Sequence, residues 1–279
     1  MGVELTVLGS GSAGNATLLS YADTNVLIDV GLSCREVSRR LEGLSVDPDS
    51  ISAIMITHAH GDHTRGARVF ARRHDVPVYM TSGVRNEWGV TDIPTVYSLT
   101  PNTIFDLSGL RFLPFEIPHD ASETVGFRIL TPEGIIGYAT DIGVMTPGLI
   151  ESFRDCNVLV VESNHATELL RVSPYAQSTR ERIAGDSGHL SNEALAAFIQ
   201  DHLGPNVRCV VLAHLSRVNN VPELADVSCR EALAACGRTD VEVVITSQDF
   251  PAKTIDLGAW LPTMPTVAGA IRQTALPFH

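Results

Sequence analysis

The sequence predicts an α/β protein in which runs of short strands are interrupted by helices. Three observations favour this class: short apolar runs of strand length, amphipathic segments of helix length between them, and no linker rich in Gly, Ser or Pro. The 44% hydrophobic and 19% charged residues are typical of a globular protein. We expect a single domain over residues 1–260 and a loose tail over residues 261–279, which contain Pro262, Pro265 and Pro277.

The N-terminal segment GSGSAG (residues 9–14) matches the Gly-x-Gly-x-x-Gly fingerprint of dinucleotide-binding proteins, and Asp29 stands where an acid that binds the ribose is expected. A helix should then follow the glycines. Instead, residues 16–21 and 26–29 have the pattern of two strands joined by a tight turn, which predicts an antiparallel hairpin. We therefore expect no dinucleotide cofactor. The glycine loop is either a turn that needs positive φ or a place where a ligand comes close.

The remaining elements follow in order along the chain. A capping box at Ser33 and Glu36 opens an amphipathic helix that ends near Leu44. The pattern then predicts a buried strand over 51–57 and a helix over 64–74. Helices are expected over 192–202 and 222–236, and further strands over 76–80, 95–99, 103–107, 110–117, 124–130, 134–140, 158–161, 209–213 and 241–245.

Charge and cysteine content narrow the classes of function. A net charge of −12 gives no general attraction to nucleic acid or anionic membranes, although an enzyme can still carry local positive charge. No apolar run approaches the roughly 18 residues of a membrane span, so no membrane partner is expected. The five cysteines include no Cys-x-x-Cys pair, which is typical of free thiols in a reducing cytoplasm. We expect a cytoplasmic protein, of an oligomeric state that the sequence does not specify.

The strongest functional signal is a group of four ligand-type side chains directly after the buried strand: His58, His60, Asp62 and His63. On a strand, His58 and His60 point to the same face. A tight turn can then bring Asp62 and His63 back beside them. Imidazole and carboxylate ligands together suit zinc, manganese or iron. With only ten histidines in the chain, this pattern favours a metal site over a chance polar loop.

This His-x-His-x-Asp-His motif resembles the one that defines the metallo-β-lactamase superfamily, and His119, Asp141 and His214 match its later positions in the same order, each after a strand. The resemblance implies a four-layer αβ/βα sandwich with two mixed β-sheets and two divalent metal ions, Zn²⁺ or Mn²⁺, at one sheet edge. It implies that one metal is held by His58, His60 and His119 and the second by Asp62, His63 and His214. Asp141 would bridge the two.

Further motifs are similar to the phosphodiesterase branch of the superfamily, which includes the tRNA 3′-processing nucleases. They are GHLSN at 188–192 and AHLS at 213–216. Asp-Ala-Ser follows His119, where an enzyme of the glyoxalase II type would continue its His-Thr-Pro-Gly-His motif. The segment between Asp141 and His214 is too short for the inserted domain of the β-CASP nucleases.

Within that branch the chain resembles the YycJ/WalJ family of bacterial double-stranded DNA exonucleases. The motifs that carry the resemblance are LGSGSAGNATLL, LIDVGLSCRE, ITHAHGDHTRG, YATDIG, VESNHATELL, GHLSNEA and LAHLSRVNN. The resemblance implies a metal-dependent phosphodiesterase that acts on DNA and removes nucleotides from the 5′ end of a duplex. The chain departs from the family at Ala166, where an Asp is expected, and beside Tyr175, where an aromatic residue is missing. Both positions fall where substrate is expected, so they bear on substrate preference.

Individual roles follow from the resemblance. Asp62 can hydrogen-bond the attacking water, His189 can stabilise or protonate the leaving oxygen, and Asp29 can orient a ligand histidine. Candidate substrate contacts are Ser12, Asn15, His165, Ser191, Asn219 and Arg180. Four arginines could meet backbone phosphates or simply be solvated: Arg171, Arg180, Arg182 and Arg217.

Alternative functions remain open at this point. One is a metallohydrolase of small molecules, such as a cyclic nucleotide phosphodiesterase or a thioesterase, and another is an RNA-processing nuclease. A third is a metal-bearing binding module without catalysis, against which the complete ligand set and His189 weigh. The width and charge of the groove around the metals distinguish DNA from small-molecule substrates.

Overall fold

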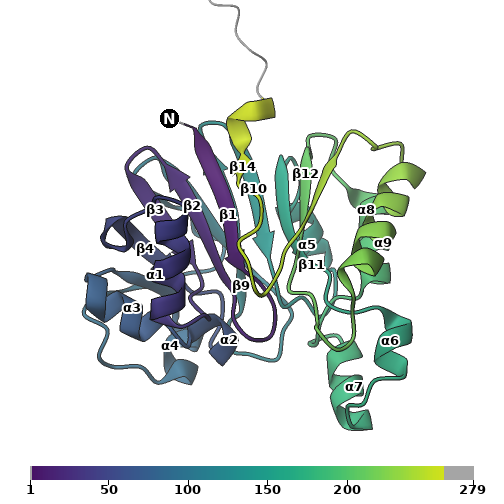
Figure 1. Cartoon of the computed structure of the whole chain (residues 1–279), viewed down its shortest axis with the longest axis horizontal. Helices are drawn as coiled ribbons and strands as arrows, with labels where there is room; N and C mark the ends of the chain where they lie inside the picture. The colour runs from purple at the N-terminus through teal and green to yellow at the C-terminus, as the bar shows by residue number, and fades with distance from the viewer. Residues whose placement is uncertain (1, 261–279) are drawn as a thin grey trace, which may run out of the picture.

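The structure is a computed structural model that describes residues 2–260, and it contains two seven-stranded mixed sheets packed face to face between outer layers of helices (Figure 1). The predicted αβ/βα sandwich is therefore confirmed. The predicted loose tail over 261–279 lies outside the described residues. Within the described range, no helix is long and apolar enough to cross a membrane.

The N-terminal sheet has the strand order β14-β1-β2-β3-β4-β5-β6. Its first three strands pair antiparallel, whereas β3, β4, β5 and β6 run parallel to one another. The strands are β1 (Val3–Gly9), β2 (Ala16–Tyr21), β3 (Thr24–Ile28), β4 (Ile51–Met55), β5 (Val78–Thr81), β6 (Val96–Leu99) and β14 (Ile255–Asp256).

The C-terminal sheet has the order β13-β12-β11-β10-β9-β8-β7, antiparallel from β7 to β10 and parallel from β10 to β13. Its strands are β7 (Phe105–Leu107), β8 (Leu110–Glu116), β9 (Val125–Thr131), β10 (Gly134–Ala139), β11 (Val158–Glu162), β12 (Cys209–Ala213) and β13 (Glu242–Ile245). In both sheets the parallel half is the one that carries long crossover connections, as such connections require.

Helices cover the outer face of each sheet, and one pair projects beyond it. The N-terminal sheet is covered by α1 (Cys34–Gly43), α3 (Ala67–His74) and α4 (Ser82–Trp88), with the short α2 (Gly61–Thr64) at its edge. The C-terminal sheet is covered by α5 (Pro147–Ser152), α8 (Asn192–His202) and α9 (Pro222–Ala235). Helices α6 (Thr167–Arg171) and α7 (Gln177–Ala184) extend at the lower right of Figure 1.

Three buried apolar layers hold this arrangement together. The central one joins the inner faces of the two sheets, for example Leu5 and Val26 of one with Phe127 and Val160 of the other. The two outer layers join each sheet to its helices. Fully burying one such side chain contributes about 1.5–3 kcal/mol, so the layers fix the relative position of the sheets.

The hairpin of β2 and β3 is confirmed, and Ser33 caps α1 by accepting a hydrogen bond from the Glu36 amide. The helix expected over 64–74 is wrong at its start, because the chain forms α2 first and begins α3 only at Ala67. Between them, a Cβ on Gly66 would lie 2.0 Å from the Leu32 carbonyl oxygen, so this close packing requires glycine. The sequence reading missed β1, β14, α4, α5, α6 and α7, which are mostly short elements whose periodicity is weak.

Candidate metal centre

The candidate ligands meet because the carboxyl ends of several strands lie at one edge of the sandwich. His58, Asp141 and His214 follow β4, β10 and β12 within a few residues of each strand's end. Asp141 and His214 have the left-handed φ values 59° and 56°, and Asp29 at the end of β3 has 59°. Such a backbone is costly for residues other than glycine, and it turns each side chain out of its strand.

The first group of ligand atoms comes from His58, His60 and His119, whose nearest ring nitrogens lie within 4.8 Å of one another. His60 Nδ1 lies 3.3 Å from His119 Nε2. His58 is fully buried, and its Nε2 has no hydrogen-bond partner among the described residues. A buried imidazole nitrogen without a partner is costly unless something binds it, so this group fits a metal ion.

The second group comes from Asp62, His63 and His214, again within 4.8 Å. Asp62 Oδ2 lies 3.4 Å from His214 Nε2 and 3.6 Å from His63 Nε2. Asp141 stands between the two groups: its Oδ2 is 3.1 Å from His63 Nε2 and its Oδ1 is 3.8 Å from His119 Nε2. The structure therefore brings together all seven residues that the sequence reading selected as ligands.

Each buried ligand histidine has a partner for its other ring nitrogen. His58 Nδ1 lies 3.0 Å from Thr57 Oγ1, and His119 Nδ1 donates to the Gly188 carbonyl oxygen at 3.1 Å. His63 Nδ1 donates to Asp29 Oδ2 at 2.7 Å. These bonds fix ring orientation and turn the opposite nitrogen toward the other candidate ligands, although His63 Nε2 also lies 3.0 Å from Asn15 Nδ2.

His214 is oriented by Glu162, a residue that the sequence reading missed. Glu162 is fully buried at the end of β11, and its Oε1 accepts from His214 Nδ1 at 2.7 Å and from His189 Nδ1 at 2.9 Å. Its Oε2 accepts from the amides of Ile142 and Leu190. The available signal was an acid that ends an apolar strand, in the segment VVES.

Electrostatics also favour a cation here. Burial works against a charged His63, yet Asp141 and Asp29 outweigh it and raise its pKa well above the usual range. Burial opposes charge on His214 as well, but Asp141, Asp62 and Glu162 raise its pKa to about 10. A buried cluster of carboxylates needs positive charge nearby, and divalent metal ions bound to neutral imidazoles supply it. The donor set therefore fits divalent metals.

His189 lies beside both groups of ligand atoms, and its side chain remains partly accessible to solvent. Its Nδ1 is held by Glu162 and is 3.6 Å from Asp141 Oδ1, and 14% of its side chain is exposed. Burial opposes its protonation, but Glu162 raises its pKa. A partly accessible histidine that retains its proton can donate to a leaving group.

Asp120 is a further acid at the open side of the first group. Its Oδ1 lies 3.3 Å from His119 Nε2 and 3.7 Å from His60 Nε2, and its Oδ2 accepts from Arg182 at 2.6 Å. Arg182 belongs to α7, so this ion pair ties the projecting helix pair to the metal loops. The sequence reading named Arg182 as a phosphate contact and assigned no role to Asp120.

The glycine loop is hydrogen-bonded to the segment that carries Asp62. Gly14 has φ 153°, and a Cβ there would meet the Gly31 backbone at 2.8 Å, which explains the glycine. Asn15 is buried, its backbone N–H donates to the Asp62 carbonyl oxygen at 2.8 Å, and its side chain bonds Gly11 at both ends. Asn15 therefore positions the loop, and its expected role as a substrate contact stays a prediction.

The other expected substrate contacts differ in what their side chains do in the structure. Ser191 Oγ accepts from the Ala194 amide and caps α8, so its side chain has a structural role. Ser12 is exposed at the tip of the glycine loop. His165 and Asn219 are buried in neighbouring loops, and among the described residues His165 Nδ1 and both amide atoms of Asn219 have no hydrogen-bond partner.

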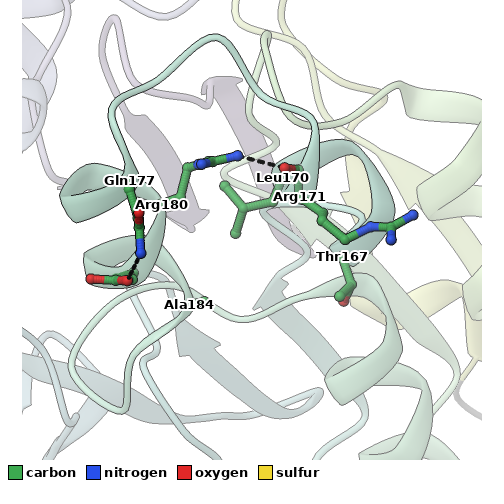
Figure 2. A pocket seen from close by; sticks show the side chains of 7 residues that line it. Thr167, Leu170, Arg171, Gln177, Arg180 and Ala184 are labelled. Carbon is green, nitrogen blue, oxygen red and sulfur yellow. Dashed lines mark hydrogen bonds between the residues drawn. The ribbon is translucent and has the colours of Figure 1, made fainter.

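The arginines expected to meet phosphates are engaged within the chain. Arg180 Nη1 reaches from α7 to the Arg171 carbonyl oxygen on α6, at 2.5 Å (Figure 2). Arg171 pairs with Glu168, and Arg217 pairs with Asp249. Figure 2 shows the cavity of about 450 Å³ between α6 and α7 that Arg171 and Arg180 line. Arg171 and Arg217 each pair one to one with a carboxylate, so neither pair carries a net positive charge.

The comparisons with known proteins agree with this fold. The chain matches the model of the beta-lactamase superfamily domain over residues 24–215, and the structure resembles the metallo-beta-lactamase fold protein YhfI from Bacillus subtilis with a TM-score of 0.69. That match has 15% identity and covers 90% of this chain and 99% of YhfI, so it shows a shared fold. The protein is thus an enzyme of the metallohydrolase class.

Within the superfamily the chain belongs to the YycJ/WalJ family. It is 31% identical over 241 residues to exodeoxyribonuclease YycJ of Bacillus anthracis, a match that covers 85% of this chain and 91% of the relative. It is 29% identical over 258 residues to exodeoxyribonuclease WalJ of Streptococcus pneumoniae, with coverage of 89% and 96%. The family resemblance carried by the sequence motifs is confirmed.

Proposed function

We propose that the protein is a phosphodiesterase with two divalent metal ions, and that its substrate is duplex DNA degraded from the 5′ end. The observation that carries the proposal is the position of Asp141, whose two oxygens face one ligand of each group. One metal would be held by His58, His60 and His119, and the other by Asp62, His63 and His214. Zn²⁺ and Mn²⁺ both suit this donor set.

Two such ions, when bound, lower the pKa of a shared water and neutralise charge on the phosphate. The chain's own residues supply the rest. Asp62 has 21% of its side chain exposed, so its carboxylate can bind a metal and also orient the attacking water. His189 Nδ1 donates to Glu162, which fixes the ring, and because Glu162 raises the pKa of His189, its Nε2 can also carry a proton and pass it to the leaving oxygen.

The proposed substrate follows from the relatives and from the local charge. Both relatives carry the name exodeoxyribonuclease, and they match most of the chain. The polarity is an expectation from the family resemblance. The unpaired amide of Asn219 and the Nδ1 of His165 are polar atoms that a nucleotide could satisfy. Hydrolysis of small phosphodiesters or thioesters is the alternative.

The test compares four substrates with Zn²⁺ and with Mn²⁺: duplex DNA labelled at the 5′ end, the same duplex labelled at the 3′ end, a cyclic nucleotide and a thioester. We expect early release of labelled mononucleotide from the 5′ label only. Release from the 3′ label first would reverse the polarity. Turnover of the small molecules alone would replace the DNA proposal by the alternative.

A further inference from the structure

We propose that the nucleic-acid backbone continues from the metal centre onto an arginine ridge formed by Arg65, Arg68 and Arg72. The inference rests on the proposed function and extends its substrate-binding surface. The ridge begins one residue after α2, which carries Asp62 and His63, and it follows α3 away from the centre. In Figure 1, α3 lies on the left of α2, opposite the α6–α7 pair.

The spacing places Arg68 and Arg72 on one side of α3. Residues four apart on a helix share a face, and these two are separated by about 6 Å along the axis. Neighbouring or alternate phosphates of one strand can match this distance. Arg65 fixes the start of the ridge at the centre, because its Nη1 donates to the Ala13 carbonyl oxygen in the glycine loop at 2.9 Å.

Asp92 holds the two outer guanidinium groups side by side. Its carboxylate accepts from Arg68 Nε at 2.7 Å and Nη2 at 2.5 Å, and from Arg72 Nη1 at 2.8 Å. Both arginine side chains remain more than half exposed, at 53% and 55%. Two cations on one anion leave a net positive charge at this exposed pair, and that charge attracts a phosphate.

The surface on either side of Arg68 is hollowed. One hollow of about 520 Å³ is lined by Arg68, Trp88, Gly89, Val90, Thr91 and Asp92, and another of about 370 Å³ by Arg68, Val69, Arg72 and Arg73. A sugar-phosphate strand that follows the ridge therefore finds space beside each guanidinium group. Trp88 also lines the larger hollow and is half-buried against the outer core.

The charge distribution singles out this segment. The chain has a net charge of −12 and only 20 Lys and Arg residues, yet four arginines fall within residues 65–73. Local positive charge attracts a polyanion even when the whole protein is acidic. Because the ridge starts at the metal centre, the polyanion that reaches it is the substrate. An acidic protein partner would have no reason to prefer this position.

The test measures binding of a nuclease-resistant phosphorothioate duplex of about three helical turns at several salt concentrations, by the metal-loaded protein. The variant R68Q/R72Q removes both outer cations, and R208Q/R230Q is the matched control, because those arginines are similarly exposed and paired with Asp240 and Asp226. We expect R68Q/R72Q to bind more weakly, with a plot of log affinity against log salt shallower by about 0.9 for each phosphate that is no longer neutralised. The control should keep the parent's slope.

A second variant tests whether duplex binding becomes tighter when the competing carboxylate is removed. Asp92→Asn removes the anion that competes with phosphate, so it should tighten duplex binding even if it loosens α3. Equal affinity and slope in R68Q/R72Q and in the control would overturn the ridge, and so would weaker duplex binding by Asp92→Asn. If the parent cleaves no DNA, the proposed function itself fails. If it cleaves DNA while R68Q/R72Q matches the control, only the ridge assignment fails.

Discussion

The two sheets supply the metal centre in different ways. The N-terminal sheet contributes four ligands from one continuous segment, residues 58–63, whereas the C-terminal sheet contributes His119, Asp141 and His214 from the ends of separate strands. A buried carboxylate backs the ligands on each side. Asp29 orients one histidine, His63, but Glu162 orients two, His214 and His189. In the proposed mechanism, the C-terminal side therefore couples metal binding to proton transfer, and the N-terminal side does not.

The largest effect should come from Glu162→Gln. An amide has one acceptor oxygen, so it cannot accept from two histidines and two backbone amides at once, and a buried donor is left unpaired. Loss of a ligand's hydrogen-bond partner typically costs 10–100-fold in metal affinity or activity. Because His189 loses its partner too, turnover should fall by at least about 10³-fold. Glu231→Gln on the exposed side of α9 is the control.

The proposed coupling of metal binding to proton transfer through Glu162 would be contradicted if Glu162→Gln lost activity but bound metal as tightly as the parent protein. Metal affinity and turnover are therefore measured on the same preparation, by titration with a metal indicator and by release of labelled nucleotide. Loss of both is the expected outcome.

His189→Ala isolates the proton-transfer half of this coupling. It should retain both metals, since His189 is not among the proposed ligands, and lose turnover by about 10²–10⁴-fold, the usual contribution of general acid–base catalysis. His202→Ala, at the exposed end of α8, serves as the control. A variant with full turnover would return His189 to a structural role, and a variant that loses metal would make it a ligand.

Asp29→Asn should have the smallest effect of the three. Asp29 Oδ1 accepts from the Thr57 amide, and Oδ2 accepts from His63 Nδ1 and Thr57 Oγ1. An amide keeps one of these acceptors, so the metal affinity of the second group should fall by about 10–100-fold. Excess metal should then restore most of the turnover, which it cannot do for Glu162→Gln. Asp23→Asn, in the exposed turn of the hairpin, is the control.

The difference between the two sheets, with contiguous ligands in one and dispersed ligands in the other, also determines how much of the site the sequence predicts. The contiguous histidine cluster was readable because its ligands share one strand end and one turn. His119, Asp141 and His214 were found only through their order in a family motif, since spacing alone does not show that distant strand ends meet. Glu162 was missed because nothing local marks a buried acid as the partner of two histidines.

Elements of the fold followed the same rule. Most of the apolar strands, though not β1, and the helices α1, α8 and α9 were predictable from periodicity, whereas α6 and α7 have too few buried residues to show it. Asn15 is a candidate substrate contact because it is polar and lies beside the glycines. Its side chain also satisfies backbone groups, a role that no sequence pattern reveals.

The central claim is that ligands from both sheets share one dinuclear centre through Asp141, and metal content tests it most directly. The metal bound per chain is measured by elemental analysis of the parent, of Asp141→Ala and of Asp155→Ala, a control aspartate that also has a left-handed backbone, with φ 61°. We expect two ions in the parent and in the control, and at most one in Asp141→Ala. Two ions retained in Asp141→Ala would contradict the account.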